Sequence, residues 1–479
     1  MERLTFSHIA WDTWVAGKLG SAAIAHRQRR RLRELVEFAR VHSPYYADRY
    51  RDLPVSGVQD IRALPPVAKG DLLRCFDDWV TDREVTRAGV DAFVADKSLV
   101  GARFLGRYFV CTTSGTTGVP TILIHDAGML ALTSAVELAR AVPAWGLSAA
   151  DWIRFGQLGG RVAGTFVTGG HFQGVASMRR RHLENPRRRQ TARMFSALAP
   201  LDEMVAGLNE YQPAVLAAYP SSLALLLEEQ ERGRLNIDPV LILPTGETLT
   251  AELRNALESI FRGHVRQSYG ASEMPVIAYD CGRGGLHVNA DWVVFEAVDE
   301  EYQPVPPGVP SRRVLLTNLA NRLQPLIRYE MGDSVVVSPE PCACGSPLPS
   351  IAVEGRNDEI LRFRGPAGRL VAIMPMALWS VVKDTPGVFR FQAIQTGAED
   401  LKVRLEPKSG AQREQVIQSL LHNLRAYLEL QGLQNVQIAF TAEPPAPNPV
   451  SGKFRHVWSE VMEPAVHPAI RVTEEWSLP

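Results

Sequence analysis

The chain has 479 residues, of which 46% are hydrophobic, and its 52 lysines and arginines balance 52 aspartates and glutamates. A net charge of zero excludes a global field that would attract nucleic acid or an anionic membrane, so we expect neither as a partner. At about 150 residues per domain, the length predicts two or three domains with large hydrophobic cores. Five cysteines are too few and too unevenly placed for a secreted disulfide framework, so reduced thiols are expected.

The amino terminus and the apolar runs bear on location. Glu2, Arg3, His8 and Asp12 interrupt the region where a signal peptide needs an apolar core. No apolar stretch approaches the ~18 to 20 residues that span a bilayer. We therefore expect a cytoplasmic protein.

The predicted elements alternate between helices and strands, which indicates an α/β fold. Leu32, Leu35, Val36 and Ala39 recur at helical spacing, so a helix is expected over 27–41, ended by a Ser-Pro pair. The other expected elements are a helix over 128–141, strands over 215–219, 240–243, 293–297 and 314–317, a rigid connector over 304–310 and a helix over 412–430. The composition changes after Gly355, which predicts a small carboxy-terminal domain.

Seven small residues in a row form the most distinctive motif: Thr112, Thr113, Ser114, Gly115, Thr116, Thr117 and Gly118. Their hydroxyls, and two glycines that accept positive φ values, suit a loop that turns its N–H groups towards phosphate. Val119 and Pro120 follow, so the run is not a Walker A motif, and an ordinary P-loop NTPase is disfavoured. A plain Ser/Thr/Gly surface loop remains the alternative.

Arginines cluster at three places, 29–31, 179–181 and 187–189. Contacts to nucleic acid or to the phosphates of CoA are one interpretation. Solvated helix faces and loops are the preferred one.

The cysteines point to a metal. Cys281 and His287 lie six residues apart and Cys342 and Cys344 follow, which supplies three sulfurs and one imidazole. These four side chains are the ligand types of a tetrahedral zinc site. Because all four ligands would come from the protein, the ion would stabilise the fold and not activate water. Free cysteines in surface loops are the alternative.

Four further segments follow in a fixed order, 269–273, 328–333, 355–360 and 451–453. Together with the seven-residue motif they resemble the motifs of the acyl-adenylate-forming enzymes, which include acyl-CoA synthetases, luciferases and peptide-synthetase adenylation domains. The stretches 43–46 and 64–72 are similar to phenylacetate-CoA ligase, CapK and coenzyme F390 synthetase-like proteins. These look-alikes have a similar cysteine arrangement, which favours the zinc interpretation.

The resemblance implies a large multi-layer N-terminal domain, with helices packed on β-sheets, and a small mobile α+β C-terminal domain. It assigns nucleotide and acyl-substrate binding to 1–357. It assigns the lid that carries the catalytic lysine to 358–479, with the hinge at Asp358.

The resemblance also implies roles for single residues. Lys453 would neutralise charge at the α-phosphate, Glu273 would bind magnesium, and the Ser272 hydroxyl would contact the α-phosphate. The motif 112–118 would hold the β- and γ-phosphates. The remaining implied nucleotide contacts are Gly246, Glu247, Tyr269, Gly270, Ala271, Asp333 at the ribose hydroxyls and Arg356. Val119 departs from the family's usual lysine, so charge compensation is expected from Mg²⁺, loop N–H groups or another cation.

The acyl pocket is implied to be lined by 155–174, 218–221 and 246–247, with Gly169, Gly170, His171 and Tyr219 as pocket residues. Glycines and aromatic rings in these segments suit a flat aromatic acid. Arg161, His171 and Arg322 are candidates to orient a polar substituent.

The resemblance thus predicts a ligase that activates a carboxylic acid, aromatic by preference, with ATP and Mg²⁺ to an acyl-adenylate and pyrophosphate, and then transfers the acyl group to CoA. One alternative is transfer of the acyl group or AMP to an amine, a carrier-protein thiol or a cofactor hydroxyl. Another is a non-catalytic nucleotide-binding protein. The expected cofactors are ATP, Mg²⁺, structural Zn²⁺ and CoA, and the oligomeric state is left open, a homodimer being one possibility.

Overall fold

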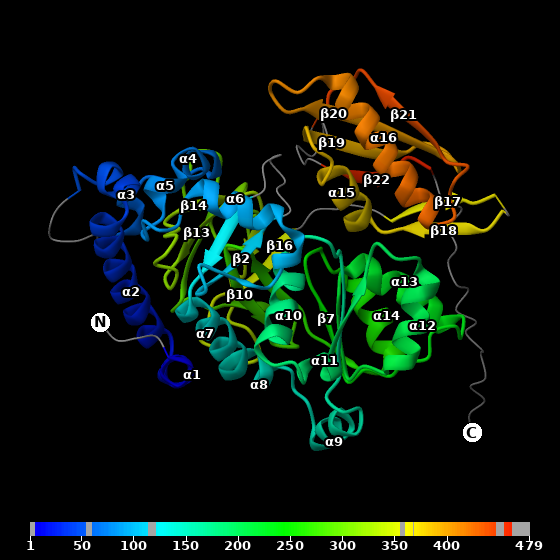
Figure 1. Ribbon diagram of the computed structural model, residues 1–479. Coiled ribbons are helices and arrows are strands. Elements are labelled where there is room, and N and C mark those ends of the chain that lie inside the picture. The colour runs from blue at the N-terminus through cyan, green and yellow to red at the C-terminus, as the bar shows by residue number, and fades with distance from the viewer. Residues whose placement is uncertain are drawn as a thin grey trace, which may run out of the picture. The chain divides into compact units, whose positions relative to one another are not determined.

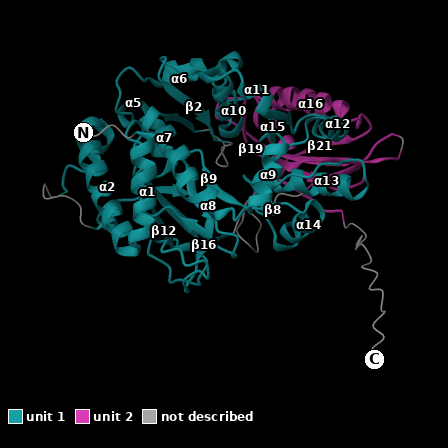
Figure 2. Cartoon of the chain, turned by 90° about the horizontal axis from the view of Figure 1, so that it is seen from below, with its two compact units in different colours: residues 1–357 teal, residues 358–479 magenta. Residues whose placement is uncertain are grey.

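The computed structural model describes residues 5–53, 60–113, 121–354, 360–366, 368–446 and 455–461 (Figure 1). The chain divides into two compact units, Met1–Asn357 and Asp358–Pro479, which are teal and magenta in Figure 2. This division falls at the boundary expected from the sequence. The functions assigned to the two parts remain predictions.

Unit 1 begins with two long helices, α1 (Phe6–Leu19) and α2 (Ser21–His42), separated by Gly20. Gly20 has φ +85°, a conformation that L side chains rarely adopt, so glycine is favoured between the helices. The helix predicted over 27–41 lies within α2, and Pro44 starts the next helix. The short helices that follow are α3 (Pro44–Arg49), η1 (Ile61–Ala63), α4 (Lys69–Arg74), α5 (Phe76–Trp79), α6 (Arg87–Ala95) and η2 (Lys97–Leu99).

A three-stranded antiparallel sheet contains Thr112, the first residue of the seven-residue motif. Its strands are β1 (Arg103–Phe104), β2 (Tyr108–Thr112) and β3 (Ile122–His125), in that order. Thr112 at the end of β2 pairs with Ile122 at the start of β3, so the motif lies in the stretch of sequence between two neighbouring strands. The chain then forms α7 (Ala127–Val136), the π-helical turn η3 (Glu137–Ala141), α8 (Val142–Ala144) and α9 (Ala149–Gln157). The helix predicted over 128–141 therefore spans α7 and η3.

A five-stranded parallel sheet follows, in the order β5-β4-β6-β7-β8. Its strands are β4 (Val162–Phe166), β5 (Ala192–Ser196), β6 (Val215–Ala218), β7 (Leu241–Pro244) and β8 (His264–Val265). The connecting helices are α10 (Gln173–Glu184), α11 (Arg188–Thr191), α12 (Leu201–Tyr211), α13 (Pro220–Glu231) and α14 (Ala251–Phe261). Because the strands run in one direction, the loops after β4, β6 and β7 leave from the same edge, which is where open α/β sheets bind ligands.

Two antiparallel sheets complete unit 1. One has the order β15-β16-β11-β10-β9 and the other the order β12-β13-β14. The strands are β9 (Ser268–Ala271), β10 (Met274–Asp280), β11 (Leu286–Val288), β12 (Val293–Val298), β13 (Arg313–Asn318), β14 (Tyr329–Met331), β15 (Ser334–Val337) and β16 (Ser350–Glu354). The strands predicted over 293–297 and 314–317 correspond to β12 and β13.

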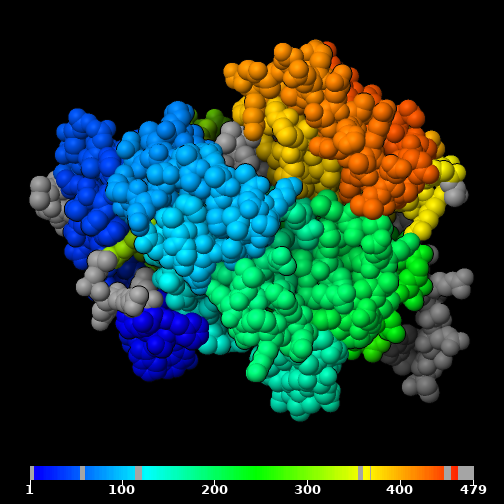
Figure 3. All heavy atoms as spheres, viewed as in Figure 1, coloured from blue at the N-terminus to red at the C-terminus, as the bar shows by residue number. Residues whose placement is uncertain are grey.

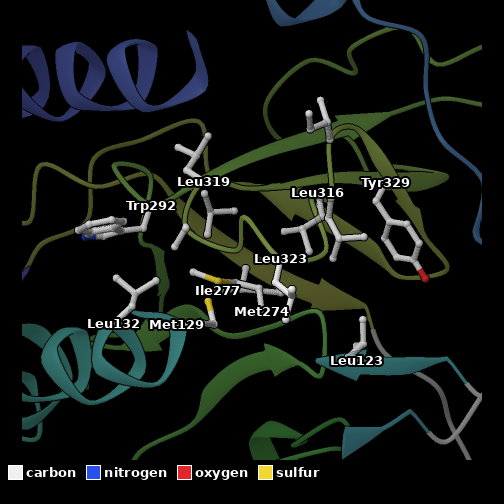
Figure 4. Close-up of a cluster of buried hydrophobic side chains, with 14 of the residues drawn as sticks. Leu123, Met129, Leu132, Met274, Ile277, Trp292, Leu316, Leu319, Leu323 and Tyr329 are labelled. Atoms are coloured by element: carbon white, nitrogen blue, oxygen red, sulfur yellow. The ribbon is translucent and has the colours of Figure 1, made fainter. Parts of the chain in front are cut away.

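The core of unit 1 joins side chains from several of these layers (Figure 4). Met129 of α7, Met274 and Ile277 of β10 and Leu316 of β13 are completely buried. Tyr329 of β14 packs into the same cluster and carries a hydroxyl. Burial of these apolar side chains therefore fixes β10 and β14 in position, and with them the polar groups that these strands carry.

Unit 2 combines a two-stranded hairpin with a four-stranded sheet of the order β21-β20-β19-β22. Its elements are β17 (Leu361–Arg364), β18 (Leu370–Ile373), α15 (Pro375–Lys383), β19 (Val388–Gln395), β20 (Asp400–Pro407), α16 (Arg413–Leu430), β21 (Gln437–Thr441) and β22 (Val457–Ser459). The helix predicted over 412–430 matches α16 within one residue.

The α/β class predicted from the sequence is confirmed. The strands expected over 215–219 and 240–243 are the neighbouring parallel strands β6 and β7. Among the described residues, none of the helices is both long enough and apolar enough to span a membrane.

Candidate functional site

Thr112 and Thr113 anchor one end of the seven-residue motif. The Thr113 N–H donates to Thr121 O, and the Thr121 N–H donates to Thr113 Oγ1, both at 2.9 Å. The Thr112 N–H donates to His171 O at 2.8 Å, and Thr112 and Phe172 form an isolated parallel β-bridge. The base of the loop is therefore joined to the connection between β4 and α10.

Glu273 lies in the turn between β9 and β10 and is 8% exposed. Tyr329 Oη donates to Glu273 Oε1 at 3.1 Å, and Asn318 Nδ2 donates to Glu273 O at 2.8 Å. Burial raises the pKa of Glu273, while the charge of Lys69 and the Tyr329 hydroxyl oppose this rise. The turn thus holds one carboxylate in a largely desolvated position with a fixed donor.

Lys69 is positioned near Glu273 by hydrogen bonds between Val67 and the segment 328–330. The Val67 N–H donates to Arg328 O and the Glu330 N–H donates to Val67 O, both at 2.9 Å, so Val67 lies alongside Tyr329. Lys69 begins α4 two residues later, and its ammonium acts on Glu273. In the sequence analysis, the stretch 64–72 contributed to the family resemblance, but Lys69 had no expected role. The missing lysine at Val119 was the available signal that a cation had to come from elsewhere.

Tyr269 and Asp333 come together from motifs that are 64 residues apart. Tyr269 Oη donates to Asp333 Oδ2 at 2.8 Å. Gly270, the residue after Tyr269, allows the backbones of β9 and β10 to approach, because a Cβ there would lie 2.1 Å from Pro275 O. Ala271 pairs with Met274 at the end of the same turn. The geometry therefore requires glycine at 270.

The main chain of Ser272 is also fixed. His125 Nε2 donates to Ser272 O at 3.0 Å. Burial lowers the pKa of His125 to about 4, so its imidazole is neutral at pH 7 and orients Ser272 without adding charge.

The loops after β4, β6 and β7 bring the other predicted residues to one edge of the parallel sheet. Phe166 and Tyr219 meet edge to face with ring centroids 5.2 Å apart. A Cβ on Gly246, which has φ +81°, would lie 2.9 Å from the Tyr219 ring. Glu247 accepts hydrogen bonds from Ser221 N and Oγ, both at 2.9 Å. Glu247 therefore caps the start of α13.

His171 turns towards α6. Its Nε2 lies 3.4 Å from Asp96 O, and its ring centroid lies 5.4 Å from that of Phe93. The residue is 2% exposed, and Nδ1 has no hydrogen-bond partner within the described part of the chain. Gly169, with φ +101°, and Gly170 precede it. The pocket roles of these three residues remain predictions.

Two arginines proposed to orient a substituent face other partners. Arg161 Nε donates to Gln212 O at 3.1 Å and precedes β4, so it lies at the opposite edge of the sheet from Phe166. Arg322 contacts Glu34 at 3.3 Å and stacks on Phe38 of α2. The structure therefore replaces those two substrate roles with packing roles, which sequence spacing does not reveal.

Several predicted site residues lie outside the described residues. They are Ser114, Gly115, Thr116, Thr117, Gly118, Val119, Arg356, Asp358 and Lys453. Their roles stay predictions.

The four proposed zinc ligands converge at one end of the β15-β16-β11-β10-β9 sheet. One ligand atom from each of Cys281, His287, Cys342 and Cys344 lies within 4.8 Å of all the others. Cys281 Sγ lies 3.6 Å from Cys342 Sγ, and Cys344 Sγ lies 3.2 Å from His287 Nε2. Adjacent pairing of β10, β11 and β16 brings these separated segments together.

The chemistry of this cluster fits a tetrahedral ion. Bonds of about 2.0 to 2.3 Å place tetrahedral ligands roughly 3.5 to 3.8 Å apart, close to the observed spacings. His287 Nδ1 donates to Leu348 O at 3.1 Å, which turns Nε2 towards the sulfurs. The Cys344 N–H lowers the pKa of the Cys342 thiol, which favours a thiolate ligand.

Relatives of known function share parts of this chain. No family model matches it. It is 25% identical over 223 residues to protein CapK of Staphylococcus aureus, covering 46% of this chain and 47% of that protein. It is 28% identical over 279 residues to phenylacetate-coenzyme A ligase of Thermus thermophilus, covering 52% of this chain and 61% of that enzyme. The matches thus span about half to three fifths of these relatives.

Solved structures match more of the chain. A 2-hydroxyisobutyryl-CoA ligase bound to 2-HIB-AMP and CoA in the thioesterification state superposes with a TM-score of 0.56 and 20% identity. The postadenylation state of that ligase with R3-HIB-AMP gives a TM-score of 0.53 and 19% identity. Each comparison covers 92% of this chain and 89% of the other.

In sequence and in fold, the chain is similar to the adenylate-forming enzymes. The recognition made from the five motifs is confirmed, and so is the predicted adenylate-forming fold. The chain is homologous to ligases that form AMP and join acids to thiols. The described part of the candidate site brings together Glu273, Tyr329, Tyr269, Asp333 and Lys69. Tyr329 and Lys69 had no role in the sequence analysis.

Proposed function

We propose that the chain activates a carboxylic acid with ATP and passes the acyl group to a thiol, that of CoA. In the first step a carboxylate oxygen of the acid bonds to the α-phosphorus of ATP, and the bond to pyrophosphate breaks. In the second step the thiol sulfur bonds to the acyl carbon and AMP leaves. Both steps concentrate negative charge, so donors and cations that are already in position carry the catalysis.

The proposal rests on two hydroxyl–carboxylate contacts, Tyr329 with Glu273 and Tyr269 with Asp333. Glu273 is a hard oxygen donor suited to Mg²⁺, which when bound neutralises phosphate charge. Asp333 presents a carboxylate, the group that accepts two hydrogen bonds from vicinal ribose hydroxyls. A protein that only retained the fold would need neither carboxylate.

Lys69 supplies the cation that Val119 does not. Its charge acts on Glu273 from the start of α4. An ammonium beside a metal-binding carboxylate is within reach of the phosphates that the metal holds. We assign it a charge-compensating role in pyrophosphate release, and we assign Lys453 the same task at the α-phosphate.

The acid is aromatic in this proposal. The Phe166–Tyr219 pair stands where the loops after β4 and β6 leave the sheet, beside Gly246. Aromatic edges and faces with nearby glycines accept a flat ring. The relative from Thermus thermophilus is a phenylacetate-coenzyme A ligase, and phenylacetate is an acid with a flat ring, which supports this choice.

A structural zinc ion completes the proposal. Cys281, His287, Cys342 and Cys344 would hold it and tie β10, β11 and the segment before β16 together. Metal analysis of protein expressed with ample zinc tests this directly: about one zinc per chain is expected, and a content near zero refutes it. The Cys344→Ser variant should lose the ion and melt at a lower temperature.

ATP–pyrophosphate exchange over a panel of carboxylic acids, with and without CoA, tests the reaction. We expect exchange that depends on an aryl acid, and a CoA thioester in the mass spectrum. Exchange without a thioester would move the acceptor to an amine, a carrier-protein thiol or a hydroxyl. Absence of exchange with every acid would refute the proposed activity.

A further inference from the structure

A dense basic surface lies outside the proposed reaction. Between Arg179 and Arg193 the chain has seven arginines and one acidic residue, Glu184. Five of the arginines have exposed side chains and form no ion pair with any described carboxylate. We call these five the arginine surface: Arg179, Arg181, Arg187, Arg188 and Arg189.

The single glutamate does not neutralise this surface. Glu184 pairs with Arg180 at 2.6 Å and also with Arg103 of β1. These contacts lower the pKa of Glu184 against the effect of its burial, so it is already engaged as a carboxylate. Glu137 also feels the charge of Arg181. Five arginines against these two glutamates leave a local excess of positive charge, although the chain as a whole is neutral.

The topology separates the arginine surface from the candidate site. The start of α10 lies beside the phosphate motif, because Thr112 donates to His171 O. The end of α10 lies beside the start of β5, because His182 Nε2 donates to Ala192 O at 2.9 Å. Val162 and Ala192 are partners in parallel strands, so this end is the amino edge of the sheet.

The 12 residues of α10 span about 18 Å between these two edges. In Figure 1, α11 lies below α10, and the part of the chain coloured from teal to green reaches the surface on the face seen in Figure 3. The arginine surface therefore lies about 18 Å from the carboxyl edge of the sheet, away from the described residues of the candidate site.

The side chains beside the arginines indicate the kind of ligand. Leu183 lies among them on α10 and is 55% exposed. An apolar centre with guanidinium groups around it is the composition of a protein interface, in which arginine is enriched. Single-stranded nucleic acid would call for exposed rings to stack on bases, and neither α10 nor α11 contains a phenylalanine, tyrosine or tryptophan.

We propose that the arginine surface docks an acidic segment of a partner protein, with Leu183 receiving one apolar side chain of that segment. Complementary charge steers the encounter and sets the orientation, while the leucine contributes buried apolar area. The site at the other edge stays open to its small substrates.

Fluorescence anisotropy with a labelled peptide, in which glutamates flank one leucine, tests the proposal. The variant Arg187→Glu/Arg188→Glu/Arg189→Glu should bind this peptide at least about tenfold more weakly than the unchanged chain. A matched control, Arg29→Glu/Arg30→Glu/Arg33→Glu, makes the same charge change on exposed residues of α2 and should bind like the unchanged chain. Raising the salt concentration should weaken binding.

A second variant separates docking from general attraction. Leu183→Ser should weaken binding of the leucine peptide, but not of a peptide with serine in its place. The proposal is overturned if the unchanged chain does not bind the peptide, if both triple variants lose binding equally, or if duplex DNA of equal charge binds more tightly. Pyrophosphate exchange should be the same in all these variants, so a chain without exchange would contradict only the proposed reaction.

Discussion

Gly270→Ala tests whether the turn between β9 and β10 sets the nucleotide site. A Cβ at this position would lie 2.1 Å from Pro275 O, and real Cβ atoms do not approach within 3.0 Å, so one strand must move by at least 0.9 Å. Forcing an extra methyl into a closely packed site costs about 1 to 3 kcal/mol. In a unit of 357 residues, with an unfolding entropy of about 2.1 cal/mol/K per residue, that lowers the melting temperature by about 1 to 4 °C. Because Tyr269 precedes the glycine, the same movement disturbs its contact with Asp333 and raises the KM for ATP.

Differential scanning fluorimetry and pyrophosphate exchange at varied ATP concentration measure these effects. Gly332→Ala is the matched control, because it stands next to Asp333 and a Cβ there would meet no atom within 4 Å. The control should melt like the unchanged chain. If Gly270→Ala keeps both its melting temperature and its KM for ATP, the reasoning about this turn is wrong.

Substitutions at three other positions address the charges of the site. Tyr329→Phe removes the hydroxyl that donates to Glu273 at 3.1 Å, so the pKa of Glu273 rises further. For a bond worth about 1.5 kcal/mol, acidification should abolish exchange at a pH about one unit higher than in the unchanged chain. Identical pH profiles would contradict this. Lys69→Met should slow exchange by about 10- to 100-fold, and Lys69→Arg, which keeps the charge, should slow it by much less. Equal rates in the two variants would show that the charge of Lys69 has no role in the reaction. Lys453→Ala should abolish adenylate formation while the Kd for ATP, measured by calorimetry, stays within about tenfold, and unchanged turnover would refute its role.

Local sequence determined the recognisable parts of this protein. The order of the five motifs indicated the superfamily, apolar periodicity located α2, and apolar runs of strand length located β6, β7, β12 and β13. The helix expected over 412–430 was α16. These patterns can be recognised in the sequence because each depends on neighbouring residues. They are either the spacing of apolar residues along a helix or strand, or the backbone freedom of glycines in a loop. The inventory of Cys281, His287, Cys342 and Cys344 was also visible, although not its convergence.

Tertiary structure decided which of these residues meet. The strand-like pairing of Val67 with the segment 328–330 brings Lys69 to Glu273 across more than 200 positions of sequence, and no local pattern encodes such a pairing. The same reason explains Arg161 and Arg322, whose residue type suited a substrate pocket but whose places in the fold give them other partners. A side chain's chemistry follows from its type, whereas its neighbours follow from how separate strands and helices bury their apolar faces together.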